Sequence, residues 1–344
     1  LHQDPMLSPA LRGVHRLTKT THVFARHTIP LECDVYAAED YPTTSPVFLY
    51  FHSGGLVTGS KACVPPWLAQ VCFKNKWPLI SASYRMLPQA KASGLLEDAR
   101  AAYTFARQWQ TSESATIERK VIVGGGSAGF FMASLTAHHL TPPPIALLSV
   151  TGIPTFQHRF FKSSVLLTPE PITQAQMTHH LSEPVSTGTT SANNPQVFHL
   201  EKILPTGAKN SAFNIHPAPL SDDGNADEFP RGCLYDYFLY KNEYPTLVGD
   251  IDPGYEWATL EAENARAEAW PPTTIIQGDA DDDVDLSVST HMVDCLDESK
   301  VKLFLAKGQP HRYEATRFIE DDVDGMDTVR QAISNLEANV ARVA

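Results

Sequence analysis

The sequence has few cysteines, and they form none of the patterns that bind a metal or build a disulfide framework. Their number is odd, their spacing is wide, and no C-x-x-C pair occurs. Neither a zinc knuckle nor a disulfide-stabilised scaffold is therefore expected, and reduced thiols in the cytoplasm are the simplest interpretation. The five cysteines are Cys33, Cys63, Cys72, Cys233 and Cys295.

Long hydrophobic stretches are absent as well. No apolar run reaches the ~18 positions that a transmembrane helix needs, and the start L-H-Q-D-P-M lacks the charged-then-apolar order of a secretory signal. Both observations predict a cytoplasmic protein without a membrane span. Because the chain begins with Leu1 rather than Met, a leader removed before this point stays open.

Dense runs of Lys and Arg are a third absence. With a formal net charge of -12 at pH 7, the chain lacks the basic surface that binds nucleic acid or an anionic membrane. Hydrophobic residues make up 42% and charged residues 19%, as in compact globular proteins. The expected partner is a small neutral or cationic substrate, and the oligomeric state is not indicated.

Short apolar runs alternate with helical patterns over most of the chain. This rhythm predicts an α/β protein with a mostly parallel central sheet and helices on both faces. The predicted strands are 22–26, 31–37, 47–51, 78–84, 120–123, 145–150, 273–277 and 301–306. The predicted helices are 63–76, 95–109, 127–140, 286–295 and 326–343.

The rhythm breaks in the middle of the chain. Residues 159–265 are rich in Pro, Ser, Thr and Asn and have only patchy helix signals, such as 168–181. A structureless loop of this length is improbable, so we expect a lid or cap subdomain inserted into a core of residues 1–158 and 266–344. Aromatic residues crowd its second half and either form a small core of the lid or line a substrate pocket. They are Phe229, Tyr235, Tyr237, Phe238, Tyr240, Tyr244, Tyr255 and Trp257.

The stretch V-I-V-G-G-G-S-A-G, residues 121–129, matches two chemical signatures. Read as G-x-G-x-x-G after a strand, it is a dinucleotide-binding fingerprint. Read as G-x-S-x-G, it is a nucleophile elbow that presents Ser127 to a substrate. A dinucleotide site needs an acidic residue about 20 positions further on, where L-L-S-V-T-G has none, and several strands precede this one. Both facts favour the elbow.

A serine nucleophile needs a base and an acid, which follow it in this chain order in α/β hydrolases. His311 follows the strand 301–306 in K-G-Q-P-H and is the predicted base. The strand 273–277 is followed by G-D-A-D-D-D-V, where Asp281 is the preferred acid and Asp279 its rival. This run lacks the Gly and Glu of a calcium loop, so no metal is expected. The other histidines, including the pairs 138–139 and 179–180, are predicted to be surface or lid residues.

The oxyanion donors are expected from F-H-S-G-G-L at the end of the strand 47–51. The backbone N–H groups of Gly54 and Gly55 can point into the site because glycine tolerates unusual dihedral angles, and Ala128 follows the nucleophile. His52 is expected to order this loop rather than react.

With these residues in place, the chain resembles α/β-hydrolase-fold serine esterases of the hormone-sensitive-lipase-like group, the α/β-hydrolase fold-3 group. The resemblance extends to Y-R-M-L-P at 84–88 and to E-D-A-R-A-A from 97, and it covers most of 20–158 and 266–320. Two residues depart from the group's usual pattern, since Ser53 replaces the first glycine of H-G-G-G and Gly126 replaces the acid of G-D-S-A-G. The resemblance implies ester hydrolysis through an acyl-enzyme without a cofactor.

The aromatic residues of the lid further suggest a small to medium hydrophobic or aromatic substrate. Three alternatives stay open: a thioesterase or lactonase acting on an intermediate of secondary metabolism, a lyase or cyclase on the same fold, and a catalytically silent ligand-binding protein. The presence of His311 argues against the last.

Overall fold

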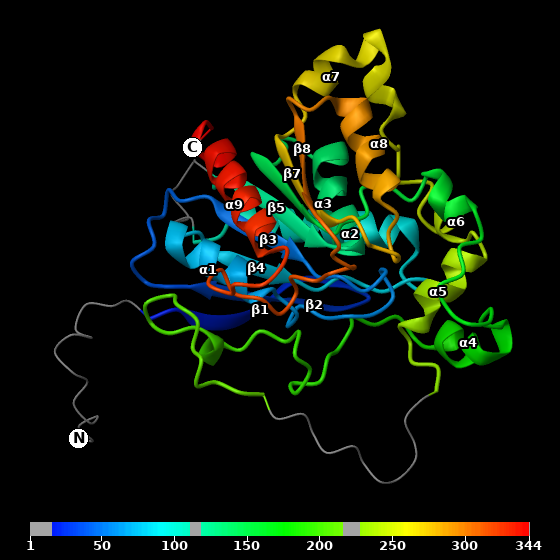
Figure 1. The fold of residues 1–344 in the computed structure, drawn as a ribbon, viewed down its shortest axis with the longest axis horizontal. Coiled ribbons are helices and arrows are strands. Elements are labelled where there is room, and N and C mark those ends of the chain that lie inside the picture. The colour runs from blue at the N-terminus through cyan, green and yellow to red at the C-terminus, as the bar shows by residue number, and fades with distance from the viewer. Residues whose placement is uncertain (1–15, 111–117, 216–227, 344) are drawn as a thin grey trace.

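A computed structural model describes residues 16–110, 118–215 and 228–343 of the chain. The first residues, on which the expectation about a leader falls, lie outside these ranges. The fold is built on an eight-stranded sheet with the order β1-β2-β4-β3-β5-β6-β7-β8 (Figure 1). The strands are β1 (Thr18–His27), β2 (Ile29–Ala37), β3 (Val47–Phe51), β4 (Leu79–Ala82), β5 (Val121–Gly126), β6 (Ala146–Val150), β7 (Thr273–Gly278) and β8 (Val301–Ala306).

Most of the sheet is parallel and covered on both faces. β1 pairs antiparallel with β2 and β2 with β4, whereas β4, β3, β5, β6, β7 and β8 run parallel to their neighbours. Every residue of the five strands from β3 to β7 is buried, which explains their nearly continuous apolar sequences. The predicted α/β class with a mostly parallel sheet is confirmed.

The sheet divides the core into two clusters, and a layer of helices covers each of them. Along β3, Val47, Leu49 and Phe51 pack with the residues of α2, α3 and α8, while Phe48 and Tyr50 pack with those of α1 and α9. This alternation follows from the two-residue period of a strand. The helices are α1 (Pro66–Asn75), α2 (Lys91–Arg107), α3 (Ala128–His139), α8 (Leu286–Leu296) and α9 (Met326–Ala341).

Two helices begin three or more residues away from their predicted starts. The helix expected over 63–76 begins at Pro66, because a proline fixes φ and suits the first turn of a helix but not its interior. The helix expected over 95–109 begins four residues earlier, at Lys91, where K-A-S-G offers no helical spacing of large apolar residues although Ala92 and Gly94 are buried.

A buried ion pair joins the two scaffold motifs that carried the resemblance. The guanidinium of Arg85, from Y-R-M-L-P, donates to both carboxylate oxygens of Asp98, from E-D-A-R-A-A, and the Arg85 N–H donates to the same carboxylate at 2.8 Å. Asp98 is fully buried. Removing one partner of such a pair leaves an uncompensated charge in the core, so both motifs must occur together.

Residues 159–265, here called the inserted segment, contribute short helices and no strand of the sheet among their described residues. Figure 1 shows α4, α5 and α6 grouped on one side of the molecule, apart from α1 and α9. The division into a core and a lid stays a prediction. Across the described residues, no helix has the combination of length and apolar character that crossing a bilayer requires. The elements of the segment are η2 (Arg159–Lys162), α4 (Gln174–Ser182), η3 (Leu200–Lys202), α5 (Cys233–Tyr240), α6 (Tyr244–Leu247), η4 (Glu256–Thr259), η5 (Glu261–Glu263) and the first residues of α7 (Asn264–Glu268).

Candidate active site

Ser127 lies on a tight turn between β5 and α3. Its backbone adopts φ 49° and ψ -127°, a conformation that is rare for residues other than glycine. The Ser127 N–H donates to Val150 O at 2.9 Å, and the Ile153 N–H donates to Ser127 O at 2.9 Å, so the end of β6 and the loop after it hold the turn in place. This strained strand-to-helix turn is the geometry of a nucleophile elbow.

Two glycines allow the elbow to pack against its surroundings. A Cβ atom at Gly125 would lie 2.2 Å from the carbonyl carbon and oxygen of Gly129, and a Cβ atom at Gly129 would lie 2.2 Å from Phe51 O. Both clashes are with backbone, which cannot rotate away as a flexible side chain can. The G-x-S-x-G spacing therefore follows from the close approach of β5, α3 and the end of β3.

His311 and Asp281 lie beside Ser127 in a chain of hydrogen bonds. His311 Nε2 lies 3.0 Å from Ser127 Oγ, and His311 Nδ1 lies 2.8 Å from Asp281 Oδ2. The carboxylate can accept but not donate, so Nδ1 carries a proton and the Nε2 lone pair of the neutral ring faces the serine hydroxyl. The structure thus brings together three residues that the sequence places as far as 184 positions apart.

The structure distinguishes the two carboxylates between which the sequence left the acid open. Besides His311, the Asp281 carboxylate accepts hydrogen bonds from the N–H groups of Val284 at 2.9 Å and Asp283 at 3.1 Å, and it is buried. Asp279 is exposed and accepts from the Gly308 N–H at 2.5 Å, which stabilises the turn before the histidine. Asp281 therefore contacts the imidazole, and Asp279 supports the loop that carries it.

The predicted oxyanion loop follows β3 and borders the same cavity as Ser127. Gly54 has φ 126° and Gly55 has φ 63°, and a Cβ atom at Gly54 would lie 2.1 Å from Thr58 O. Among the described residues, no acceptor is recorded for the N–H of Gly54 or Gly55. Ala128 is the first residue of α3, where the helix supplies no partner for an N–H group. None of the three N–H groups therefore has a backbone acceptor within the described chain, and Gly54 and Gly55 line the cavity.

Three side chains from outside the loop hold it in shape, and sequence reasoning missed all of them. Tyr84 Oη donates to His52 O at 2.8 Å, and Tyr244 Oη of the inserted segment donates to Gly55 O at 2.5 Å. Arg231 Nε donates to Val57 O at 2.8 Å. Tyr84 belongs to the Y-R-M-L-P motif, which could have indicated it, whereas no local pattern marks the other two.

His52 orders this loop, as the sequence analysis expected. Its Nδ1–H donates to Ser53 O at 2.8 Å, and its ring stacks on Tyr84 with the ring centres 4.4 Å apart. Burial lowers the pKa of His52 to about 4, despite the hydrogen bond to Ser53 O, which favours the protonated form. The imidazole is therefore neutral at pH 7 and must be protonated in the core as the pH falls.

We expect His52 to make folding stability fall on acidification. Its folded pKa of about 4 lies below the ordinary 6.5, so its contribution is complete above pH 6.5 and is lost as the pH falls towards 4, by about 3 kcal/mol in all. A His52→Gln variant should show a flatter dependence of the free energy of unfolding on pH, measured by urea denaturation from pH 7.5 to 4.5. The same change at His199, whose ring contacts a backbone carbonyl and no carboxylate among the described residues, is the control. Equal slopes for the wild type and His52→Gln would contradict the prediction.

Tyr50 explains why glycine stands at position 126. A Cβ atom there would lie 2.7 Å from Tyr50 Oη, which occupies the space that the group's usual acidic side chain would need. The charges nearby come from another part of the chain. Arg312 Nε lies 3.7 Å from the same Cβ position, and Glu314 is fully buried. Burial raises the pKa of Glu314 above its ordinary value, opposed by Arg312, and Arg312 has no ion pair among the described residues.

The cavity over Ser127 has a volume of about 470 Å³, within the range of small-molecule sites. Ser127, His311 and both oxyanion glycines border it. The rest of its lining is mostly polar, and much of it comes from the inserted segment. These lining residues include Thr189, Thr190, Ser191, Asn194, Gln196 and Arg312.

The aromatic residues of the inserted segment serve mainly as packing. Tyr235 alone among the eight lines the cavity, and its Oη donates to Asp283 O at 2.7 Å. Tyr237, Phe238, Tyr244 and Tyr255 are buried against the main core. Of the two interpretations that the sequence left open, the structure favours packing, although the core they join is that of the whole protein rather than a separate one.

The paired histidines are not all surface residues as predicted. His138 lies among the rings of Tyr255 and Trp270, with ring centres 5.1 Å and 4.7 Å away, and both of its ring nitrogens are buried. Burial, aided by His139 and Arg266, lowers its pKa well below the ordinary value. The prediction was wrong for His138 because these aromatic contacts come from residues more than a hundred positions further along the chain.

The chain is similar in sequence and in fold to known proteins. Residues 48–202 match a family model described as the alpha/beta hydrolase fold. A solved structure of an alpha/beta hydrolase superfamily protein from Enterococcus faecalis superposes with a TM-score of 0.63 at 16% identity, covering 93% of this chain and 99% of that one. The chain is an α/β-hydrolase-fold protein. The predicted resemblance to the hormone-sensitive-lipase-like group is confirmed by the family match.

Two curated relatives match part of this chain and a smaller part of their own length. Lipase 2 of Moraxella sp. (strain TA144) is 30% identical over 141 residues, which are 40% of this chain and 32% of the lipase. A non-reducing polyketide synthase of Stereocaulon alpinum is 32% identical over 122 residues, which are 33% of this chain and 5% of the synthase. The chain therefore spans less than a third of either relative's length.

Proposed function

We propose that the protein is a serine hydrolase that cleaves a carboxylic ester through an acyl-enzyme. The observation that carries the proposal is the hydrogen-bonded chain from Ser127 Oγ through His311 to the buried Asp281 carboxylate. The matching lipase adds support from a relative with a named activity. An intact nucleophile, base and acid argue against a silent binding protein.

In the first step, Ser127 Oγ attacks the ester carbonyl while His311 Nε2 takes the hydroxyl proton. The imidazolium that forms is stabilised by Asp281, whose buried carboxylate also keeps the ring in the productive tautomer. Negative charge develops on the former carbonyl oxygen as the tetrahedral intermediate forms. The N–H groups of Gly54, Gly55 and Ala128 are the proposed donors to this oxyanion, each typically contributing about 10²- to 10³-fold in rate.

The intermediate then collapses to the acyl-enzyme. The bond to the alcohol breaks, and His311 Nε2–H gives its proton to the leaving oxygen. Water next attacks the acyl carbonyl and loses a proton to the same nitrogen, which returns it to Ser127 Oγ when the acid is released. Every proton taken by His311 is given back within the cycle, so the protein's own residues complete it.

The substrate we propose is a small to medium ester that presents polar groups. A hydrophobic or aromatic substrate was expected from the sequence, and Tyr235 supplies one aromatic wall for it. The hydroxyl and amide side chains of the remaining lining favour oxygen-bearing substituents. Arg312 also borders the cavity without an ion pair among the described residues, and it suits a carbonyl or carboxylate oxygen of the substrate.

The inserted segment is proposed to act as the lid that sets this preference. It supplies Thr189, Thr190, Ser191, Asn194 and Gln196 to the cavity wall. The cytoplasm stays our proposed location, supported by five free cysteines, which suit a reducing compartment.

A second candidate is hydrolysis of a thioester in secondary metabolism. The match to the non-reducing polyketide synthase favours it. The acyl group of the thioester substrate would then be a polyketide. The same residues serve, because a thioester carbonyl takes the same attack and gives the same oxyanion. A hydroxyl-rich acyl group of this kind also suits the polar cavity.

A panel of acyl donors tests both candidates. We expect the purified protein to react with a fluorophosphonate probe and to hydrolyse p-nitrophenyl esters, with kcat/KM higher for a hydroxybenzoyl ester than for a decanoyl ester. Matched N-acetylcysteamine thioesters of the same acids are assayed beside them. Thioester turnover that is tenfold faster than ester turnover favours the second candidate, and no labelling together with no turnover would refute both.

A further inference from the structure

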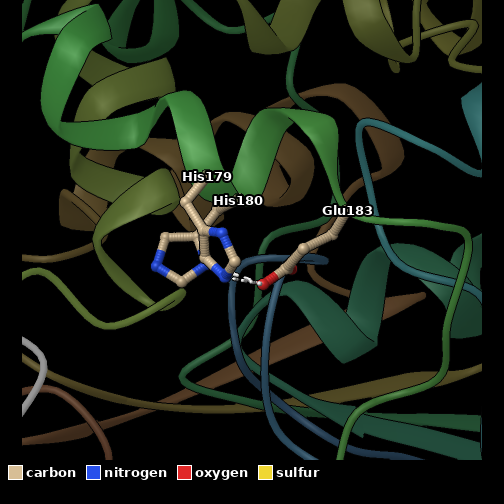
Figure 2. A group of neighbouring side chains, drawn as sticks. All are labelled: His179, His180 and Glu183. Atoms are coloured by element: carbon tan, nitrogen blue, oxygen red, sulfur yellow. Dashed lines mark hydrogen bonds and ion pairs between the residues drawn. The ribbon is translucent and has the colours of Figure 1, made fainter.

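A cluster of three possible metal ligands lies at the end of α4, outside the candidate active site. His179 and His180 occupy the last turn of the helix, and Glu183 is its C-terminal capping residue. Figure 2 shows the two imidazoles and the carboxylate turned towards one another. His179 is exposed, whereas His180 is buried, so the cluster faces solvent on one side only.

Two of the three distances between the ligand atoms are close to those between neighbouring ligands on a tetrahedral metal ion. Glu183 Oε1 lies 3.3 Å from His179 Nε2 and 3.1 Å from His180 Nδ1. Zinc bound at 2.0 to 2.1 Å in a tetrahedron keeps neighbouring ligand atoms about 3.3 Å apart. The ring centres of the two histidines are 5.3 Å apart, and two imidazoles on one such zinc ion hold theirs roughly 5 Å apart. The remaining edge, between the two histidines, is at most 4.8 Å.

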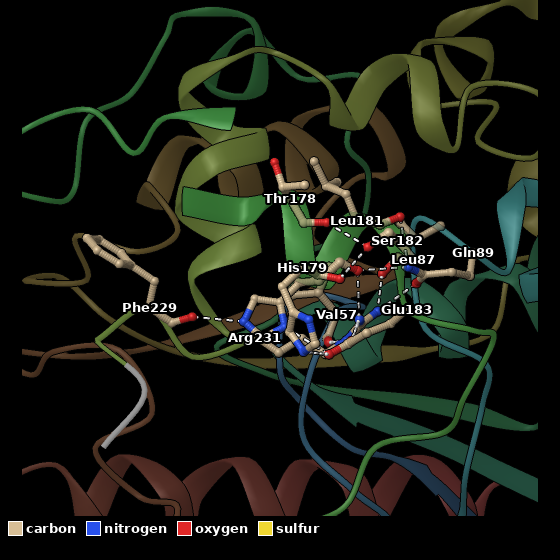
Figure 3. A network of polar contacts seen from close by, with 11 residues as sticks. Val57, Leu87, Gln89, Thr178, His179, Leu181, Ser182, Glu183, Phe229 and Arg231 are labelled. Carbon is tan, nitrogen blue, oxygen red and sulfur yellow. Dashed lines mark hydrogen bonds and ion pairs between the residues drawn. The ribbon is translucent and has the colours of Figure 1, made fainter. Parts of the chain in front are cut away.

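The groups behind the cluster are those that support metal ligands. His180 Nε2 lies 2.8 Å from Phe229 O, a carbonyl, so this nitrogen carries the proton and Nδ1 is left to face the carboxylate. Arg231 donates to the other carboxylate oxygen, Glu183 Oε2, as the network in Figure 3 shows. A backbone carbonyl behind a histidine and a hydrogen bond to the far carboxylate oxygen are the usual outer partners of a bound metal.

His180 presents one ring nitrogen to the carboxylate. Its Nδ1 lies 3.1 Å from Glu183 Oε1, while Nε2 on the other side of the ring faces Phe229 O. An imidazole nitrogen and a carboxylate oxygen are two of the ligand types that zinc sites combine.

We propose that His179, His180 and Glu183 form a zinc site, with solvent as the fourth ligand on the exposed side. Two imidazoles and one carboxylate in a tetrahedral arrangement suit Zn²⁺ better than Mg²⁺ or Ca²⁺, which prefer six or more oxygen ligands. The sequence analysis expected no metal and assigned these two histidines to the surface or the lid. The site depends on Glu183 and Arg231, which the fold brings together.

In a second cluster of possible metal ligands, an arginine side chain already contacts the carboxylates. His27, Glu97 and Asp98 also place three ligand atoms within 4.8 Å of one another. There the guanidinium of Arg85 already lies between the carboxylates, donating to Asp98 at 2.7 Å and Glu97 at 2.6 Å. This guanidinium contacts Asp98 Oδ1, the same oxygen that faces His27, whereas Arg231 contacts Glu183 Oε2 and leaves Oε1 to the two histidines. The cluster around His27 is therefore predicted not to bind zinc and provides a matched control.

Zinc at this position would stabilise the contact between the inserted segment and the oxyanion loop. Arg231, which holds Glu183, also donates to Leu87 O and to Val57 O, both at 2.8 Å (Figure 3). A ligand that binds only the folded arrangement raises the stability of the whole protein. We therefore expect added zinc to raise the melting temperature.

The test uses an untagged, EDTA-treated protein titrated with ZnCl₂ in competition with a fluorescent chelator. We expect one equivalent of zinc per chain, an upward shift of the melting temperature, and the visible spectrum of tetrahedral Co²⁺ when cobalt replaces zinc. His179→Ala removes an exposed ligand without disturbing the core and should raise the dissociation constant at least tenfold. Glu183→Gln should do the same.

The His27→Ala variant is the control and should bind zinc as the wild type does. Circular dichroism of each variant establishes that it is folded before titration. The proposal is overturned if the wild type binds less than one equivalent, or if His179→Ala binds zinc as tightly as the wild type. The first result would mean that the three side chains form a hydrogen-bonded and ion-paired cluster without a metal.

Discussion

Replacing Ser127 with alanine is expected to lower kcat for ester hydrolysis by about 10⁴- to 10⁶-fold. The Oγ atom 3.0 Å from His311 Nε2 is the proposed nucleophile, and alanine leaves no atom to form the acyl-enzyme. The backbone conformation of the elbow disfavours alanine no more than serine, so the fold should persist. The remaining activity would come from the oxyanion donors acting on water.

The measurement is the hydrolysis of a p-nitrophenyl ester together with labelling by the fluorophosphonate probe. Ser163→Ala, which changes a surface serine outside the cavity, is the control and should label and turn over like the wild type. Thermal unfolding of both variants checks that they are folded. If labelling and turnover of Ser127→Ala equal those of the wild type, the serine hydrolase proposal fails.

Replacing Asp281 with asparagine is expected to lower kcat by about 10⁴-fold. Asp281 Oδ1 accepts from the N–H groups of Asp283 and Val284, so the single carbonyl oxygen of asparagine would take this place and its NH₂ group would face the histidine. An NH₂ group cannot accept the hydrogen bond that His311 Nδ1–H now makes to Asp281 Oδ2, so the ring is no longer held in the tautomer that presents its lone pair to Ser127. The positive charge formed on the imidazole during attack also loses its counter-charge. KM should change far less than kcat.

Asp279→Asn is the matched control, because both residues belong to the same acidic turn. Asp279 is exposed and contacts the Gly308 N–H, so its replacement should change kcat by less than tenfold. Steady-state kinetics of the two variants on one ester compare the carboxylates directly. A larger loss for Asp279→Asn than for Asp281→Asn would reverse the assignment of the acid.

The sheet was predictable because its strands are buried on both faces. β3 and β8 match their predicted ranges 47–51 and 301–306. A strand without a solvent-facing side has no polar alternation to obscure it, so an apolar run between turn signals suffices. Helix starts were less predictable, as Lys91 shows, because the first turn of α2 packs small residues that give no periodic signal.

Ser127, Asp281 and His311 were predictable because each follows a parallel strand. The carboxyl ends of parallel strands meet at one edge of a sheet, so three residues far apart in the sequence converge there. The sequence favoured Asp281 over Asp279 as the acid, but it could not show which of the two carboxylates turns inward. That orientation is determined by the N–H groups of Asp283 and Val284, which hold Asp281.

The supports of the oxyanion loop were beyond sequence reasoning for a different reason. Tyr244 lies 189 positions from Gly55, and Arg231 lies 174 positions from Val57. Neither residue belongs to a periodic pattern or a motif, and the inserted segment that carries them has little regular structure. Contacts of this kind depend on how an irregular segment folds back onto the core, which local propensities do not encode.

The hydrogen bond from Tyr244 to Gly55 O has a consequence for how this protein can change. The inserted segment lines the cavity and also holds the backbone of the oxyanion loop. Replacing the segment would therefore change substrate range and turnover at the same time. A segment taken from another protein would provide a different cavity lining. It would lack the hydrogen bonds that hold the oxyanion loop unless it carried equivalents of Tyr244 and Arg231. Directed evolution towards new substrates should therefore leave these two side chains untouched and vary the stretch around Thr189 to Gln196, which lines the cavity without bracing it.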